Sequence, residues 1–201
     1  MIKLKICGLT RRKDVETAVK IGAKYLGFIF CDKSPRCVTP EQVKEISRNL
    51  PDGVKKVGVF VNASIEDIQQ IVEFCSLDVV QLHGDESPEF ARQLKGIKVW
   101  KALRLCNPND MEVAKNYPAD MILIDAMTAE QRGGTGKLCN WGLAAKLSSV
   151  RPIVLAGGIG YSNILKAVTQ VNPVIIDVNS GAESAPGIKD ETKLTNIGEI
   201  I

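Results

Sequence analysis

Eight short apolar segments recur along the chain at intervals of about 20–30 residues, and this rhythm restricts the fold more than any other feature. The segments are rich in Val, Ile and Leu and lack a clean alternation of apolar and polar residues. That pattern is typical of parallel strands buried on both faces. The segments are residues 3–7, 25–30, 56–61, 78–83, 97–105, 120–125, 152–158 and 173–181.

Helix-start signals fill the gaps between these segments. Thr39 and Gln42 form a capping box, with Pro40 at the first helical position. Ser64 with Asp67 is expected to open a second helix. Three further residues are expected to cap later helices: Ser87, Asn140 and Ser162. Strands that alternate with helices throughout predict an α/β protein.

Two α/β architectures accommodate this alternation, a doubly wound open sheet and a closed barrel. A dinucleotide-binding open sheet favours Gly-x-Gly-x-x-Gly after its first strand, whereas the turn here reads Cys7-Gly8-Leu9-Thr10. Eight units of about 25 residues each match a lean barrel. Because no linker or change of composition divides the chain, the sequence predicts a compact, single (β/α)8 barrel over residues 1–201.

Composition excludes several classes of partner and cofactor. The 26 Lys and Arg residues nearly balance 23 Asp and Glu residues, which gives no electrostatic reason to expect nucleic acid. The apolar runs are too short to span a bilayer, and the first residues do not resemble a signal peptide, so we expect a cytoplasmic protein. With a single histidine and no Cys-x-x-Cys pair, a metal site is not expected. Four cysteines are expected to be small buried side chains: Cys31, Cys75, Cys106 and Cys139.

Polar side chains gather where the predicted strands end, which is the face that carries the active site in (β/α)8 barrels. Cys7 follows the first strand and Asp125 ends the sixth. A thiol becomes a useful base when its neighbours lower its pKa, and a carboxyl group in an apolar mouth becomes an acid. The alternative interpretations are a core thiol for Cys7 and a helix cap for Asp125. Lys5 lies on the same strand face but deeper, so we do not expect it to assist Cys7 directly.

Other rim residues suggest binding of an anionic ligand. Arg36, in a long loop, is either a clamp for a carboxylate or a solvated surface side chain. His83 either orients a ligand or bonds the backbone. Glycines follow the last two strands, at Gly157 and Gly158 and again near Ser180, and either bind phosphate through backbone N–H groups or only form tight turns. The glycine-rich stretch 133–136 is either a lid or a flexible connection.

The motifs at these positions resemble one family, phosphoribosylanthranilate isomerase of tryptophan biosynthesis. The resemblance runs nearly end to end. It rests on KICGLT (5–10), GFIF and KSPRCV (27–38), VGVFVN (57–62), VQLHG (80–84), ILID (122–125), GGTGK (133–137), LAGGI (155–159) and DVNSGAES (177–184).

The resemblance implies a (β/α)8 barrel without cofactor or metal. Its implied activity is the Amadori rearrangement of N-(5-phosphoribosyl)anthranilate to 1-(2-carboxyphenylamino)-1-deoxyribulose 5-phosphate. It assigns the general base to Cys7, the general acid to Asp125 and the group that binds the anthranilate carboxylate to Arg36. The remaining residues it implies are Asp177 for sugar hydroxyls and Gly157, Gly158, Ser180 and Gly181 for phosphate.

Two alternatives remain beside this interpretation. One is another phosphosugar barrel enzyme, such as an aminoaldose isomerase of histidine biosynthesis or an indole-forming synthase. The other is a non-catalytic phosphate-binding barrel. The oligomeric state is not predicted.

Overall fold

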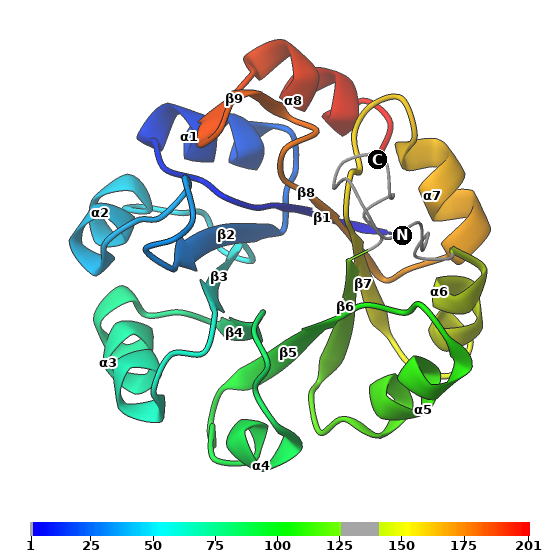
Figure 1. Cartoon of the computed structure of the whole chain (residues 1–201). Coiled ribbons are helices and arrows are strands. Elements are labelled where there is room, and N and C mark those ends of the chain that lie inside the picture. Colours follow the sequence, from blue (N-terminus) through cyan, green and yellow to red (C-terminus); the bar gives the residue numbers. More distant parts are fainter. Residues whose placement is uncertain (1, 126–140) are drawn as a thin grey trace.

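Eight parallel strands close into a barrel in chain order, with β8 hydrogen-bonded to β1 (Figure 1). This computed structural model describes residues 2–125 and 141–201, and it confirms the predicted (β/α)8 architecture. The strands are β1 (Lys3–Ile6), β2 (Tyr25–Phe30), β3 (Lys55–Phe60), β4 (Val79–Leu82), β5 (Lys98–Leu103), β6 (Met121–Asp125), β7 (Ile153–Ala156) and β8 (Ile175–Val178).

Helices surround the barrel and follow the strands in turn (Figure 1). The predicted caps Thr39, Ser64 and Ser87 each accept a backbone N–H through the side chain. Ser162 is a wrong prediction, because α7 starts at Ile164 after Asn163; Asn140 lies outside the described residues. The helices are α1 (Arg12–Lys20), α2 (Pro40–Ile46), α3 (Ile65–Cys75), α4 (Pro88–Ala91), α5 (Pro108–Asn116), α6 (Trp141–Ser148), α7 (Ile164–Val171) and α8 (Glu191–Gly198).

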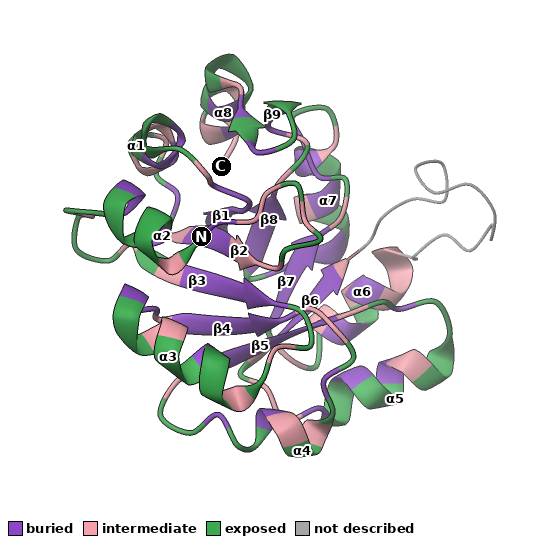
Figure 2. Cartoon of the chain, turned by 60° about the vertical axis from the view of Figure 1, so that its left-hand side comes forward, coloured by how far each residue is buried: buried purple, intermediate pink, exposed green. Residues whose placement is uncertain are grey.

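The strands are buried on both faces, as their apolar runs predict (Figure 2). Their outward side chains pack against the helices in the main core. Their inward side chains form a second cluster that fills the N-terminal part of the barrel, where Trp100 contacts Tyr25 with ring centroids 5.0 Å apart. The C-terminal part of the barrel interior is polar instead and contains the buried side chains of Lys5, Gln81 and Asp177.

Two features differ from the sequence expectations. The last strand ends at Val178, and a short antiparallel hairpin of β9 (Glu183–Ala185) and β10 (Ile188–Lys189) follows it. Of the cysteines expected inside, only Cys75 is buried; Cys31 is half-buried and Cys106 is exposed, while Cys139 lies outside the described residues. Cys106 lies in the loop between β5 and α5, on the surface rather than in the core.

None of the helices in the described ranges is long and apolar enough to cross a membrane. The cytoplasmic location stays a prediction.

Candidate active site

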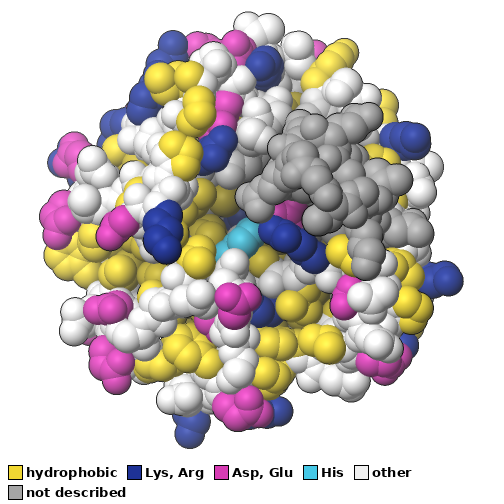
Figure 3. Space-filling model, in the orientation of Figure 1, with side chains coloured by type: hydrophobic (Ala, Val, Ile, Leu, Met, Phe, Trp, Pro, Cys, Tyr) yellow, Lys and Arg dark blue, Asp and Glu magenta, His cyan; other side chains and the backbone are white. Residues whose placement is uncertain are grey.

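The polar residues at the strand ends meet in one cavity of about 410 Å³ at the C-terminal mouth of the barrel. This size suits a small-molecule ligand. Basic side chains border the centre of this face (Figure 3). Eight of the nine residues predicted for the site line the cavity: Cys7, Arg36, His83, Asp125, Gly157, Gly158, Asp177 and Ser180.

Cys7 follows β1 and is only 4% exposed. Gly27 on β2 makes room for the thiol, because a Cβ at position 27 would lie 2.6 Å from Cys7 Sγ. Burial raises the pKa of the Cys7 thiol, while the nearby positive charge of Lys5 acts in the opposite direction. Lys5 makes its hydrogen bond to Asp177, and its effect on Cys7 is through its charge.

Lys5 and Asp177 form a fully buried ion pair with Nζ and Oδ2 2.6 Å apart. The two residues are direct partners in the β1–β8 pairing, so the strand register brings them together. Burial disfavours the ammonium, but Asp177 outweighs this effect and raises the pKa of Lys5. Asp177 lines the cavity, and its second carboxylate oxygen, Oδ1, is buried and has no hydrogen-bond partner among the described residues. A buried carboxylate oxygen without a hydrogen-bond partner is rare in folded proteins.

Asp125 ends β6 and faces the single histidine. Asp125 Oδ2 lies 4.0 Å from Nε2 of His83. On the other side of the ring, Nε2 of Gln81 lies 2.9 Å from His83 Nδ1. In this amide orientation Gln81 donates to Nδ1, which places the ring proton on Nε2, towards Asp125. Burial lowers the pKa of His83, so the imidazole is neutral at pH 7 and acts as a hydrogen-bond donor.

A buried carboxylate holds the loop that carries His83. Glu86 accepts hydrogen bonds from the backbone N–H groups of Asn62 and Gly84, at 2.8 and 2.9 Å. It also forms an ion pair with Lys101 at 2.8 Å, with both side chains nearly inaccessible. These buried contacts therefore hold the loop in one position.

Two glycine-bearing loops lie side by side at the last strands. Gly157 and Gly158 have φ values of 89° and 64°, which favour glycine. Asn163 fixes their loop, since its side chain accepts from Gly160 N and donates to Gly158 O, both at 2.9 Å. Gly181 does not line the cavity but packs against that loop, and a Cβ there would lie 2.0 Å from Ile159 O.

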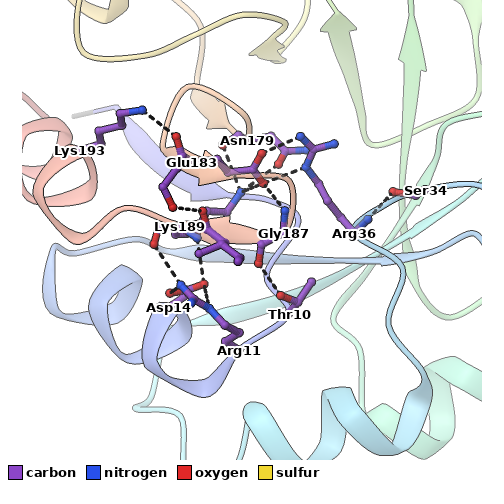
Figure 4. A network of polar contacts seen from close by, with 12 residues as sticks. Thr10, Arg11, Asp14, Ser34, Arg36, Asn179, Glu183, Gly187, Lys189 and Lys193 are labelled. Carbon is purple, nitrogen blue, oxygen red and sulfur yellow. Dashed lines mark hydrogen bonds and ion pairs between the residues drawn. The ribbon is translucent and has the colours of Figure 1, made fainter.

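Arg36 reaches the cavity from the loop between β2 and α2, where its backbone N–H donates to Ser34 Oγ. Its side chain is 19% exposed, so it is not a solvated surface residue. Glu183 binds the guanidinium through two hydrogen bonds, from Nε at 2.8 Å and from Nη2 at 2.6 Å (Figure 4).

Three further observations complete the site. Within the described ranges, no group of three or more His, Cys, Asp or Glu residues is arranged to hold a metal ion. Arg104 lines a neighbouring cavity of about 440 Å³ that shares His83 and Asp125 with the first. The stretch 133–136 lies outside the described residues.

Sequence reasoning missed several residues that support the site. Gln81 stands two positions before His83, and that spacing places both on one strand face, so alternation was a usable signal. Glu183 gave no such signal, because its partner Arg36 is 147 residues away in the chain. Asn163 was missed because Ser162, beside it, is also a favoured helix cap.

Together the fold and the cavity define a (β/α)8 barrel with an acid, a thiol and glycine-bearing loops at the catalytic face. The family model for N-(5'-phosphoribosyl)anthranilate (PRA) isomerase matches residues 4–199. The N-(5'-phosphoribosyl)anthranilate isomerase of Pelobacter propionicus is 45% identical over 194 residues, which cover 96% of this chain and 92% of that protein. That of Clostridium acetobutylicum is 42% identical and covers 96% and 95%.

Solved structures agree with this grouping. Phosphoribosyl anthranilate isomerase from Thermotoga maritima superposes with a TM-score of 0.89 at 40% identity, over 98% of this chain and 96% of that one. A crystal structure of phosphoribosyl anthranilate isomerase in complex with reduced 1-(o-carboxyphenylamino)-1-deoxyribulose 5-phosphate superposes with a TM-score of 0.88 at 37% identity, covering 99% and 97%. The chain belongs to the N-(5'-phosphoribosyl)anthranilate isomerase family and is an isomerase of tryptophan biosynthesis.

Proposed function

We propose that this protein catalyses the Amadori rearrangement of N-(5-phosphoribosyl)anthranilate by general acid–base catalysis, as a single barrel domain and without a cofactor. The observation that carries the proposal is the convergence of Cys7 and Asp125 on one cavity beside two glycine-bearing loops. The reaction needs one acid and one base at different atoms of one sugar, and these two groups come from different strands of the barrel.

In the first step Asp125 protonates the furanose ring oxygen. The bond between this oxygen and C1 breaks, and the anthranilate nitrogen lone pair stabilises the resulting cation as an iminium. His83 lies beside the acid, with its Nε2 proton directed towards Asp125 at 4.0 Å. The neutral imidazole orients the carboxyl group and donates to the oxygen that has been released.

In the second step the Cys7 thiolate removes the proton from C2. The electron pair of that C–H bond moves into the iminium and gives a neutral enolamine, which tautomerises to the ketone. A raised pKa makes the thiolate a stronger base but reduces its population. The Lys5 ammonium favours the thiolate by its charge, and so limits that loss.

Other cavity residues bind the rest of the substrate. The loops that contain Gly157, Gly158, Ser180 and Gly181 bind the phosphate. Oδ1 of Asp177, which has no hydrogen-bond partner among the described residues, accepts a hydrogen bond from a sugar hydroxyl. Arg36 binds the anthranilate carboxylate with a planar, charged fork of donors.

The test is a fluorescence assay that follows the loss of N-(5-phosphoribosyl)anthranilate, with a chelator present throughout. Wild type is compared with Cys7→Ser, Asp125→Asn and the control Cys106→Ser, whose thiol lies outside the cavity. We expect turnover by wild type and the control, and losses of about 10²–10⁴ in kcat for the two site variants.

Three outcomes contradict the proposal. If Cys7→Ser and Asp125→Asn are as active as wild type, the assignment of these residues as base and acid is refuted. Inactivity that appears only with chelator indicates a metal-dependent reaction. A wild type that binds the reduced product analogue but never turns over substrate is a non-catalytic binding barrel.

A further inference from the structure

The guanidinium of Arg36 has two hydrogen-bonding edges, and Glu183 occupies only one of them. The Nε and Nη2 atoms on the inner edge donate to the two oxygens of Glu183. Among the described residues, no other acceptor receives a hydrogen bond from this side chain. The outer edge, formed by Nη1 and the second proton of Nη2, therefore keeps its donors for a ligand in the cavity that Arg36 lines.

Glu183 is itself held rigidly. Its side chain is 5% exposed, and Oε1 also accepts from Lys189 Nζ at 2.8 Å and from Gly187 N at 3.2 Å (Figure 4). Burial opposes its ionisation, but the hydrogen bonds from Arg36 and Lys189 outweigh this effect and lower the pKa of Glu183 to about 2. The carboxylate stays charged over the whole range in which an enzyme is assayed.

The residues around Arg36 and Glu183 restrict the movement of the Arg36 guanidinium. Lys189 also donates to the backbone and side-chain oxygens of Asn179, at 3.1 and 2.9 Å, and its own side chain is fully buried. The stem of Arg36 crosses Gly8, where a Cβ would lie 2.7 Å from Arg36 Cδ. The β9–β10 hairpin thus fixes the orientation of an arginine that comes from the opposite end of the sequence.

The charges of this cluster favour an anion. Glu183 carries one negative charge between two cations, Arg36 and Lys189. One positive charge is left over, and Arg36 is the cation that lines the cavity. A planar carboxylate fits the free edge of a guanidinium by accepting two parallel hydrogen bonds.

We propose that Glu183 is a positioning residue that selects substrates with a carboxylate, by fixing Arg36 so that its outer edge faces the ligand. This inference rests on the proposed function, since it assigns the substrate carboxylate to that edge. Glu183 itself does not touch the substrate. Without Glu183 the guanidinium is free to turn, and the carboxylate loses its oriented partner.

The test compares two substrates that differ only in the carboxylate, N-(5-phosphoribosyl)anthranilate and the analogue made from aniline. The variants are Glu183→Gln and a control, Asp14→Asn. Asp14 is an equally buried carboxylate of the same cluster, which pairs with Arg11 and accepts from Lys189 N but does not contact Arg36. The readouts are kcat and KM for each substrate, and the melting temperature.

For Glu183→Gln we expect kcat/KM for the anthranilate substrate to fall about 10–100-fold, mainly through KM, because an oriented charged hydrogen bond is lost. The value for the aniline analogue should change less than about threefold. Asp14→Asn should lower the melting temperature and leave the ratio between the two substrates unchanged. An equal fall for both substrates with Glu183→Gln, or an unchanged ratio, overturns the proposal.

A binding experiment separates this inference from the reaction itself. Reduced 1-(o-carboxyphenylamino)-1-deoxyribulose 5-phosphate and its counterpart without the carboxylate are titrated into wild type and Glu183→Asp by calorimetry. The aspartate keeps the charge but is one methylene shorter, so it is expected to fold when the glutamine variant does not. A wild type that binds the carboxylated ligand more tightly but does not turn over refutes the proposed reaction and leaves the role of Glu183 intact. If wild type and Glu183→Asp prefer the carboxylated ligand over its counterpart to the same extent, the role of Glu183 is refuted.

Discussion

At the scale of single residues, the environment of Cys7 affects both the base strength of its thiolate and the fraction of molecules that carry the thiolate. The thiol is buried beside Gly27, and burial raises its pKa. A base with a higher pKa removes a carbon-bound proton more effectively, yet fewer molecules carry it deprotonated at pH 7. Lys5 lies close enough to reduce this cost, although its main partner is Asp177.

The raised pKa of Cys7 predicts that both alkylation and catalysis increase with pH into the alkaline range. The base is the deprotonated form, so kcat/KM should rise about tenfold per pH unit below the pKa. Iodoacetamide labelling of the Cys7 peptide, followed by mass spectrometry, should have its midpoint above that of N-acetylcysteine. Stability has the opposite sign: the buried neutral thiol stabilises the fold below its ordinary pKa, and this contribution is lost as pH rises through the folded-state pKa. A Cys7 midpoint below that of N-acetylcysteine would contradict this assignment.

At the scale of elements, the site depends on how closely neighbouring strand-to-helix loops fit. The loop after β7 and the loop after β8 touch through a bridge between Gly160 and Gly181. No side chain fits at position 181, because Ile159 O would lie 2.0 Å from its Cβ. The proposed function requires both loops to keep their places, so that their N–H groups converge on the substrate phosphate.

Gly181→Ala is therefore expected to weaken substrate binding by pushing the two loops apart. KM should rise about 10–100-fold, because displacements of about 1 Å have effects of that size. The control is Gly198→Ala in α8, where the added Cβ would lie 2.6 Å from Ile21 Cβ, away from the cavity. Steady-state kinetics should show a raised KM in the first variant only. An unchanged KM for Gly181→Ala would mean that the phosphate binds elsewhere.

At the scale of the whole molecule, closure of the barrel brings the two ends of the chain together and creates the polar part of its interior. The seam between β1 and β8 pairs Lys5 with Asp177, 172 residues apart in sequence. Both side chains are buried, so each charge requires the opposite charge of its partner to offset the loss of hydration. The seam therefore contributes to stability and to the site at once.

Lys5→Met should lower the free energy of unfolding by about 3–5 kcal/mol, since it leaves Asp177 buried without its cation. Urea denaturation followed by circular dichroism measures this change. The double variant Lys5→Met/Asp177→Asn should recover part of the loss because no unpaired charge remains. A loss below about 1 kcal/mol for Lys5→Met would show that water or another cation compensates Asp177.

The sequence by itself determined the number and order of the eight barrel strands, because period and composition are local properties of a buried parallel strand. It also determined three helix caps and placed Cys7, His83 and Asp125 at strand ends, since strand boundaries fix where side chains can reach the rim. Only the tertiary structure decided the partners: Lys5 with Asp177, Glu183 with Arg36, and Asn163 with the loop of Gly158. Most of these contacts join residues far apart in the chain, and closure of the barrel brings them together. The direction of the Cys7 pKa shift depends on burial, which no local pattern of residues contains.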